Sequence, residues 1–385
     1  MKKLINIFLI FIMCFVITGC KEKELEKNKI EVSEIKEETT KDYKMSVITF
    51  GDALIHPAVF NDAIRGSSTY NFKKMFTEVG KIIEGYDLKF YNQETVIGGS
   101  SFAASGYPTF NSPNAIGNDL IDIGFNVVNL SSNHTMDKGV VGATHSANFW
   151  KNKEGVYAVG SYTSQAERDE VVIKEMNGIT YTMLSYTYGT NGIAVPSGYG
   201  YLVNLYSDAQ AKKDIEKVRD KVDVVMVSMH WGTEYTHTPT SEQVRQAKYL
   251  ASLGVDVIIG HHPHVLQPVT FIDDTLVIYS LGNMISNQRV LGVEKNIGLT
   301  VAFDIEKHVE NGEADVKVTN VKADLTWVKS TNASLSGSYN FSVIPFSQVT
   351  DSMLANHENV YKNYMSIVNK YNSDKIQMGF FANGN

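Results

Sequence analysis

Short apolar runs typical of strands alternate with segments of helical spacing along this chain of 385 residues. Strands are predicted at 46–50, 88–91, 126–130, 222–229 and 255–259, and helices at 71–84, 114–123, 137–150, 207–218 and 241–253. Helices between strands favour a mostly parallel sheet with covered faces. Further strands predicted at 171–175, 179–185, 269–272, 276–280, 299–305, 316–321 and 325–328 add antiparallel pairs, and a helix at 352–371 closes the chain. The pattern therefore predicts an α/β fold.

The first 20 residues have the pattern of a bacterial export signal. A basic start at residues 1–3 precedes an apolar stretch at 4–17, and the segment closes on Ile-Thr-Gly-Cys at 17–20. The apolar stretch is too short for an ordinary membrane-spanning helix. The last four residues resemble a lipobox, in which Cys20 is lipidated, whereas the alternative is an uncleaved anchor with an incidental cysteine. The first reading predicts an extracytoplasmic protein held on the cell membrane by lipid.

Composition divides the rest of the chain into three parts. Residues 21–44 are mostly Lys and Glu and predict a flexible tether, residues 45–345 a folded domain, and residues 346–385 a C-terminal helix and tail. The two cysteines, Cys14 and Cys20, both precede the domain, so the domain has neither a disulfide nor a thiol nucleophile. A net charge of −7 without a basic stripe argues against nucleic-acid binding.

Polar side chains gather just after the carboxyl ends of the predicted strands. They are Asp52, Glu94, Asn133, His134, His230, His262 and His264. Ligands of open α/β sheets bind outside these strand ends, and imidazoles and carboxylates are common metal ligands. Pro263 stiffens the turn that carries the last two histidines. Singly, each residue could be a turn residue, a surface group or a core histidine, but together they predict one shared metal site.

Several short motifs follow one another along the chain in a specific order. They are Gly51-Asp52, Asn92-Gln93-Glu94, Phe-x-x-Pro at 110–113, Asn-Leu-x-x-Asn-His-x-x-Asp-x-Gly at 129–139, His-Trp-Gly-x-Glu-Tyr at 230–235, Gly-x-His-Pro-His-Val-Leu-Gln-Pro at 260–268 and Tyr-Ser-Leu-Gly-Asn at 279–283. From Met45 to Ser286 the chain resembles the CapA family of bacterial capsule-synthesis proteins, which are linked to poly-γ-glutamate. The resemblance implies a fold similar to the calcineurin-like metallophosphoesterases, a two-sheet sandwich flanked by helices in four layers, αββα.

The resemblance also implies roles for the clustered residues. A divalent centre of one or two ions, Mn, Zn or Fe, would be held by Asp52, Glu94, Asn133, His230, His262 and His264. His134 matches a catalytic histidine, which would protonate a leaving group. Asp137 could orient His134, or it could cap the next helix.

The chain departs from the metallophosphoesterase pattern in two motifs. Leu54 stands where those enzymes carry a ligand histidine, and Asn-x-Glu at 92–94 replaces Gly-Asp-x-x-Asp. A single ion, a weaker second ion and a contribution from His56 all stay open. Supporting roles are predicted for His56, Asn92 and Glu234.

Other residues near these motifs have two readings. Trp231, Tyr235 and Tyr188 could wall a cleft or pack in the core, and His261 is read as a support to its neighbours or as loop surface.

Two functions agree with these expectations. The first is a membrane-anchored lipoprotein of capsule polymer synthesis or export, of the poly-γ-glutamate type, which works in a membrane complex. The second is an extracytoplasmic metal-dependent hydrolase of a phosphoester or a γ-glutamyl amide bond. An anionic polymer or a phosphoester is the expected substrate, with no nucleic-acid partner. The sequence leaves open whether the centre is catalytic.

Overall fold

The computed structural model describes residues 40–65, 69–288, 292–332, 334 and 337–381. The predicted export signal with Cys20, and residues 21–39 of the predicted tether, lie outside these ranges. The chain divides into two units, Met1–Glu38 and Thr39–Asn385, and all structure below concerns the second. Among the described residues, no helix is both long enough and apolar enough to cross a membrane.

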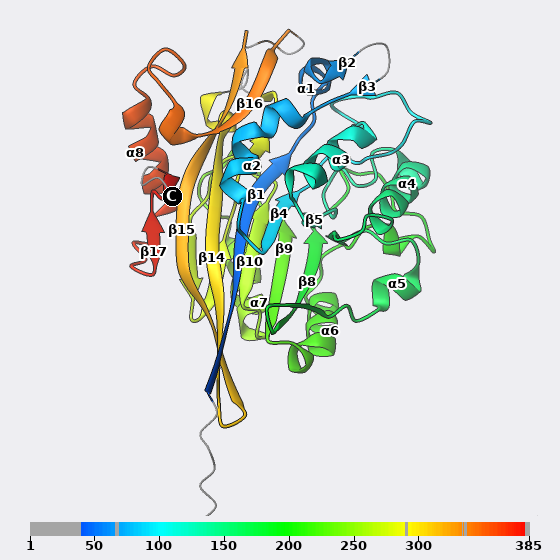
Figure 1. Ribbon diagram of the computed structural model, residues 1–385. Coiled ribbons are helices and arrows are strands. Elements are labelled where there is room, and N and C mark those ends of the chain that lie inside the picture. Colours follow the sequence, from blue (N-terminus) through cyan, green and yellow to red (C-terminus); the bar gives the residue numbers. More distant parts are fainter. Residues whose placement is uncertain (1–39, 66–68, 289–291, 333, 335–336, 382–385) are drawn as a thin grey trace, which may run out of the picture. The chain divides into compact units, whose positions relative to one another are not determined.

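Nine strands form the larger sheet of this unit (Figure 1). Its main path runs β16-β15-β14-β1-β4-β5-β6, while β13 pairs with β1 and β17 with β15. The bounds are β1 Thr40–Ala53, β4 Leu88–Asn92, β5 Val127–Asn129, β6 Tyr157–Val159, β13 Asn283–Ile285, β14 Ile297–Glu310, β15 Glu313–Thr331, β16 Tyr339–Pro345 and β17 Ile376–Met378. β1, β4, β5 and β6 are parallel, whereas β14, β15 and β16 add antiparallel pairs beside β1.

A second sheet has six strands in the order β11-β12-β10-β9-β8-β7. The bounds are β7 Lys174–Met176, β8 Ile179–Thr187, β9 Val224–His230, β10 Val257–His261, β11 Val269–Ile272 and β12 Thr275–Ile278. The four central strands are parallel, and β7 and β11 pair antiparallel at the edges. A small pair, β2 (Ile64–Arg65) and β3 (Thr69–Tyr70), stands apart from both sheets.

Apolar residues on both faces of the strands account for the layered packing. In β1, Val47 enters the core between the sheets, while the alternate residues Ile48 and Phe50 pack on the outer face. In β9, Met226 faces the inter-sheet core and Val225 the outer one. Because these strands are buried on both faces, their sequences are nearly continuous apolar runs.

Helices cover the outer faces of both sheets (Figure 1). The nine-stranded sheet is covered by α1 (Pro57–Asp62), α2 (Thr77–Ile83), α3 (Asn114–Ile123) and α4 (Gly139–Lys151), and the six-stranded sheet by α6 (Asp208–Val218) and α7 (Ser241–Ser252). The short α5 (Gln165–Asp169) follows β6, and α8 (His357–Val368) packs against β15. The predicted αββα sandwich is therefore confirmed.

Several predicted boundaries differ from the structure. The predicted helix at 71–84 is a 3-10 helix at Lys73–Phe76 followed by α2 at Thr77–Ile83, and the predicted strand at 171–175 begins only at Lys174, as β7. β1 begins at Thr40, so residues 40–44 are strand rather than tether, because they pair with β14 and Lys44 lies 2.6 Å from the carboxylate of Asp304. The predicted strands at 316–321 and 325–328 are one strand, β15. Asp324 does not interrupt it, because its buried carboxylate accepts hydrogen bonds from Tyr361 and the amide of Phe381. The closing helix spans only His357–Val368 of the predicted 352–371.

Candidate metal centre

The predicted ligands meet at one edge because strands of both sheets end there. Asp52 lies near the end of β1, and His230 is the last residue of β9. Glycine permits the close backbone approach that this requires. A Cβ atom at Gly51 would lie 1.9 Å from the carbonyl oxygen of Gly282, and one at Gly260 would lie 2.0 Å from that of Tyr279.

The histidine turn after β10 adopts a backbone conformation that is rare for residues with side chains. His262 has φ 95°, His264 has φ 58°, and Tyr235, in the loop after β9, has φ 61°. Such residues persist where surrounding contacts hold them. The amide of Tyr235 donates to the carbonyl of Pro263 at 2.8 Å, and the amide of His262 lies 3.4 Å from Asp52 Oδ2. These contacts fix the turn to β1 and to the loop after β9.

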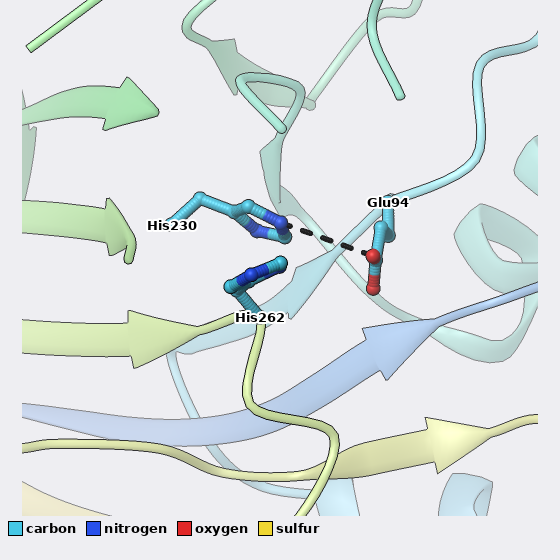
Figure 2. Close-up of side chains that lie close together, drawn as sticks. All are labelled: Glu94, His230 and His262. Carbon is cyan, nitrogen blue, oxygen red and sulfur yellow. Dashed lines mark ion pairs between the residues drawn. The ribbon is translucent and has the colours of Figure 1, made fainter. Parts of the chain in front are cut away.

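The side chains of the cluster point toward one another. Figure 2 shows Glu94, His230 and His262 converging from the loop after β4, the end of β9 and the turn after β10. Glu94 Oε1 lies 3.8 Å from His230 Nε2 and 3.7 Å from His264 Nε2. Three groupings each have ligand atoms within 4.8 Å of one another: Glu94, His230 and His262; Asp52, Glu94 and His264; and Glu234, His262 and His264.

The environment of Glu94 shows whether the clustered residues are suited to binding a cation. The side chain is fully buried, yet neither carboxylate oxygen has a hydrogen-bond partner among the described residues. Burial raises the pKa of Glu94 well above its usual range. Close by, Asn133 Oδ1 lies 2.9 Å from His230 Nε2, which brings an amide oxygen and an imidazole together beside Glu94. A buried carboxylate that has no hydrogen-bond partner among the described residues and faces imidazoles fits the donor set of a divalent cation.

Asp52 is the charged residue at the base of the cluster. Burial alone would raise its pKa, but the neighbouring imidazoles of His261 and His264, each 3.3 Å away, hold it well below the usual range. Burial would lower the pKa of His264, yet Glu94 and Asp52 raise it to about 9. Burial lowers the pKa of His262 to about 3, which leaves a neutral imidazole suited to metal binding. His261 is fully buried beside Asp52, so its reading as loop surface is wrong.

A chain of buried amides positions Asp52. Asn92 Nδ2 donates to Asp52 Oδ1 at 2.8 Å, and Asn129 Nδ2 donates to Asn92 Oδ1 at 2.7 Å. Ser185 in β8 then donates its hydroxyl to Asn129 Oδ1. The predicted support from Asn92 is therefore its hydrogen bond to Asp52. Together the three hydrogen bonds connect β1, β4 and β5 of one sheet to β8 of the other.

His134 and Asp137 form a separate pair beside the cluster. His134 Nδ1 lies 2.7 Å from Asp137 Oδ2, and the same oxygen accepts the amide of Phe110 at 2.6 Å. The N-cap of α4 is Lys138, so Asp137 orients the imidazole instead of capping the helix. With Nδ1 donating to the carboxylate, Nε2 is the ring atom available for proton transfer.

A cavity of about 520 Å³ adjoins the cluster. It is lined by Leu54, His56, Pro57, Tyr107, Phe110, His134, Glu234, Tyr235, His264, Asn287 and Gln288. His56 lies with Nδ1 3.1 Å from the carbonyl of Leu54 and 3.2 Å from the amide of Asn287. Burial lowers its pKa to about 4. His56 belongs to none of the three ligand groupings found in the described ranges.

The aromatic residues with two readings separate clearly. Tyr235 lines the cavity, and Tyr188 is 51% exposed with its ring 4.7 Å from that of His262. Trp231 is only 2% exposed and packs in the core under α6 and α7.

Sequence reasoning gave no role to three residues that hold the cluster. Asn129 and Ser185 support Asp52 as described, and Asn283 Oδ1 lies 3.1 Å from His264 Nδ1. Asn129 and Asn283 stand inside motifs of the sequence, which was their available signal, whereas Ser185 stands in a strand without one.

Comparison with known proteins gives the chain clear relatives. A family model described as "Bacterial capsule synthesis protein PGA_cap" matches residues 46–288. The PGA biosynthesis protein CapA of Bacillus subtilis (strain 168) is 32% identical over 177 residues, 44% of each chain. The capsule biosynthesis protein CapA of Bacillus anthracis is 33% identical over 173 residues, 43% of this chain and 41% of that one. The chain thus covers less than half the length of these relatives.

One of the similar solved structures is the calcineurin-like phosphoesterase YfkN of Bacillus subtilis. It is 15% identical, with a TM-score of 0.47, and the match covers 84% of this chain and 99% of that one.

Proposed function

This chain belongs to the family of bacterial capsule synthesis proteins, and on that premise we propose that it serves capsule polymer synthesis or export as a lipid-anchored protein with a divalent-metal hydrolase centre. The observation that carries the metal centre is Glu94, a fully buried carboxylate without a hydrogen-bond partner among the described residues, facing His230 and His264. The names of the two Bacillus relatives support the polymer role, and poly-γ-glutamate is the polymer they suggest.

The residues divide the chemistry of such a centre between them. Asp52, Glu94, Asn133, His230, His262 and His264 would hold the cation, which when bound would act as a Lewis acid and lower the pKa of water. His134 is positioned by Asp137 to give a proton through Nε2 to the leaving group. The cavity beside His134 accommodates the substrate, a phosphoester or a γ-glutamyl amide. On hydrolysis, water adds its hydroxyl group to the phosphoryl or acyl product and its remaining proton to the leaving group.

The sequence supports attachment through Cys20, because residues 17–20 resemble a lipobox that follows a short apolar stretch.

The test measures metal content, hydrolysis and polymer yield. The mature protein in detergent, with added Mn²⁺ or Zn²⁺, should retain at least one ion and cleave a model phosphodiester or a γ-glutamyl oligomer. Glu94→Gln should lose both properties, while Glu216→Gln, a change in an exposed residue of α6, should lose neither. Retention of no ion would refute the metal centre, and unchanged polymer in a deletion strain would refute the capsule role.

A further inference from the structure

A second cavity, the edge cavity, has a volume of about 210 Å³ and lies apart from the candidate metal centre. Its lining comes from the C-terminal part of α4, from β6 at the edge of the nine-stranded sheet, from β7 and β8 of the six-stranded sheet, and from α5 and α6. None of its described lining residues is a candidate metal ligand or lines the cavity of about 520 Å³. A molecule bound in the edge cavity would therefore lie outside the proposed hydrolase centre.

Ion pairs between helices hold the wall of the edge cavity in place. Arg168 of α5 donates from both terminal nitrogens to the carboxylate of Asp214 in α6, at 2.9 and 2.7 Å. Asp214 is buried and also accepts the hydroxyl of Tyr186 at 2.9 Å. Lys151 of α4 binds Glu167 of α5 at 3.1 Å. Because an arginine that binds both oxygens of a carboxylate has a fixed geometry, the edge cavity is preformed.

Three buried polar atoms of the edge cavity call for hydrogen-bond partners. Trp150 is 1% exposed, and Ser161 and Asn204 are each 7% exposed. Trp150 Nε1, Ser161 Oγ and Asn204 Oδ1 have no hydrogen-bond partner among the described residues. Buried polar groups in native proteins are nearly always hydrogen-bonded, so three in one cavity indicate a molecule that supplies their partners. They offer it an N–H donor, a hydroxyl that can donate or accept, and a carbonyl acceptor.

Charges of both signs surround the same cavity. Besides the two ion pairs of its wall, the lining includes two further lysines and two further carboxylates, Lys174, Lys217, Asp169 and Glu170. Lys217 is half-buried and the other three are exposed, so these four charges lie toward solvent while the three polar atoms are buried. A rim with equal numbers of both signs complements a molecule that carries both signs itself, and it disfavours a simple anion or cation.

The volume of the edge cavity limits the size of that molecule. A cavity of about 150 Å³ holds benzene, which has six non-hydrogen atoms, so about 210 Å³ holds roughly eight or nine. This is the size of a small free amino acid with a polar side chain.

We propose that the edge cavity is a binding site for a small zwitterion of amino-acid size. The polar side chain of this ligand bonds to Trp150, Ser161 and Asn204. Its carboxylate faces the lysines of the rim, and its ammonium group faces the carboxylates. The inference does not depend on the proposed hydrolase centre, so binding of the zwitterion persists when metal is removed.

Calorimetry and equilibrium dialysis of the full mature protein in detergent and EDTA test the site. The probes are asparagine and threonine, which are polar zwitterions, aspartate, which carries one extra negative charge, and leucine, whose side chain is apolar. Asparagine or threonine should bind at one site per chain. Aspartate and leucine should bind at least about 10-fold more weakly, because one lost hydrogen bond to a buried group corresponds to about that factor.

Variants of Ser161 place the binding in the edge cavity. Ser161→Ala removes a hydroxyl that has no partner within the described ranges, so it should fold normally and weaken binding of the polar zwitterions by about 10-fold. Ser161→Leu should fill part of the cavity and abolish binding, with circular dichroism to confirm its fold. Ser366→Ala, a change in an exposed residue of α8, is the matched control and should bind as the wild type does.

Three results would overturn the inference. They are failure of the wild type to bind either polar zwitterion, as expected of a cavity that holds only water; equal binding of all four probes; and unchanged binding in Ser161→Ala. Retention of the zwitterion by a protein that binds no metal would leave the inference standing and refute only the metal centre.

Discussion

Replacement of Glu94 by Gln should make the metal-free protein more stable. Without an ion, the cluster buries the carboxylates of Asp52 and Glu94 against the imidazole of His264, whose pKa is raised to about 9 by these two groups. Burial raises the pKa of Glu94, so the metal-free fold either holds a second negative charge there or takes up a proton at neutral pH, and both cost free energy. Glu94 has no hydrogen-bond partner among the described residues, whereas Asp52 receives a hydrogen bond from Asn92. Glutamine has nearly the same shape and removes this cost.

The size of this effect follows from the burial of Glu94. An unsatisfied buried polar group costs about 1–3 kcal/mol, and a charged one costs more. Glu94→Gln should therefore raise the free energy of unfolding in EDTA by about 1–3 kcal/mol. An ion at 1,000 times its Kd adds about 4.1 kcal/mol to the wild type, while a variant whose Kd exceeds the ion concentration gains less than about 0.4 kcal/mol. The order of stability should then reverse.

Thermal unfolding followed by circular dichroism compares the stability of the variant with that of the wild type, once in EDTA and once in excess Mn²⁺. The variant should melt a few degrees higher than the wild type in EDTA, and lower than the wild type in Mn²⁺. Glu216→Gln is the control for a loss of charge at an exposed site. A variant that is less stable than the wild type in EDTA would refute the reasoning, because Glu94 would then be paired in the metal-free protein.

Three further outcomes test other parts of the structure. Asp137→Asn should lower the rate of hydrolysis by roughly 10- to 100-fold at unchanged metal content, because His134 loses its orienting partner; an unchanged rate would contradict that role. Gly260→Ala should destabilise the domain by about 3 kcal/mol or more in urea unfolding, since its Cβ would meet a backbone oxygen, whereas Gly189→Ala has open space and should be neutral. Asp223→Asn should cost about 1.5–3 kcal/mol at pH 7, because the carboxylate binds Lys307 across the sheets. Burial would raise the pKa of Asp223, but hydrogen bonds from Lys307 and Thr180 lower it, so this stabilisation is present above about pH 4 and should vanish as urea unfolding is measured at lower pH.

The sequence predicted the fold where burial leaves a periodic pattern. Apolar residues on both faces of β1 and β9 mark strands between two covered layers, and polar residues after these strands mark the edge where Asp52 and His230 meet. β6 has only three residues, Tyr157–Val159, and becomes a strand through pairing with β5, which no local signal indicates. Residues 40–44 are mostly exposed on the start of β1 and include the charged Lys41, Asp42 and Lys44, so their sequence does not distinguish them from a tether.

The arrangement of the site depended on contacts between distant segments. Ser185 supports Asp52 only because β8 of one sheet lies beside β5 of the other at this point. Glu234 approaches His262 because the amide of Tyr235 binds Pro263, a contact that requires an uncommon backbone angle at Tyr235. The spacing of residues along the chain predicts neither of these contacts, so Glu234 was not among the predicted ligands.

The ligands of the candidate centre come from both sheets, and this gives the cation a second consequence. Asp52 lies in β1 and Glu94 in the loop after β4 of the nine-stranded sheet, whereas His230 ends β9 and His262 lies in the turn after β10 of the six-stranded sheet. Both cysteines of the chain precede the domain, so no disulfide can clasp the two halves. An ion bound between these segments would be a reversible cross-link, and it would have to dissociate before the two sheets could separate. The supply of metal ions would then govern how long the folded domain survives proteolysis.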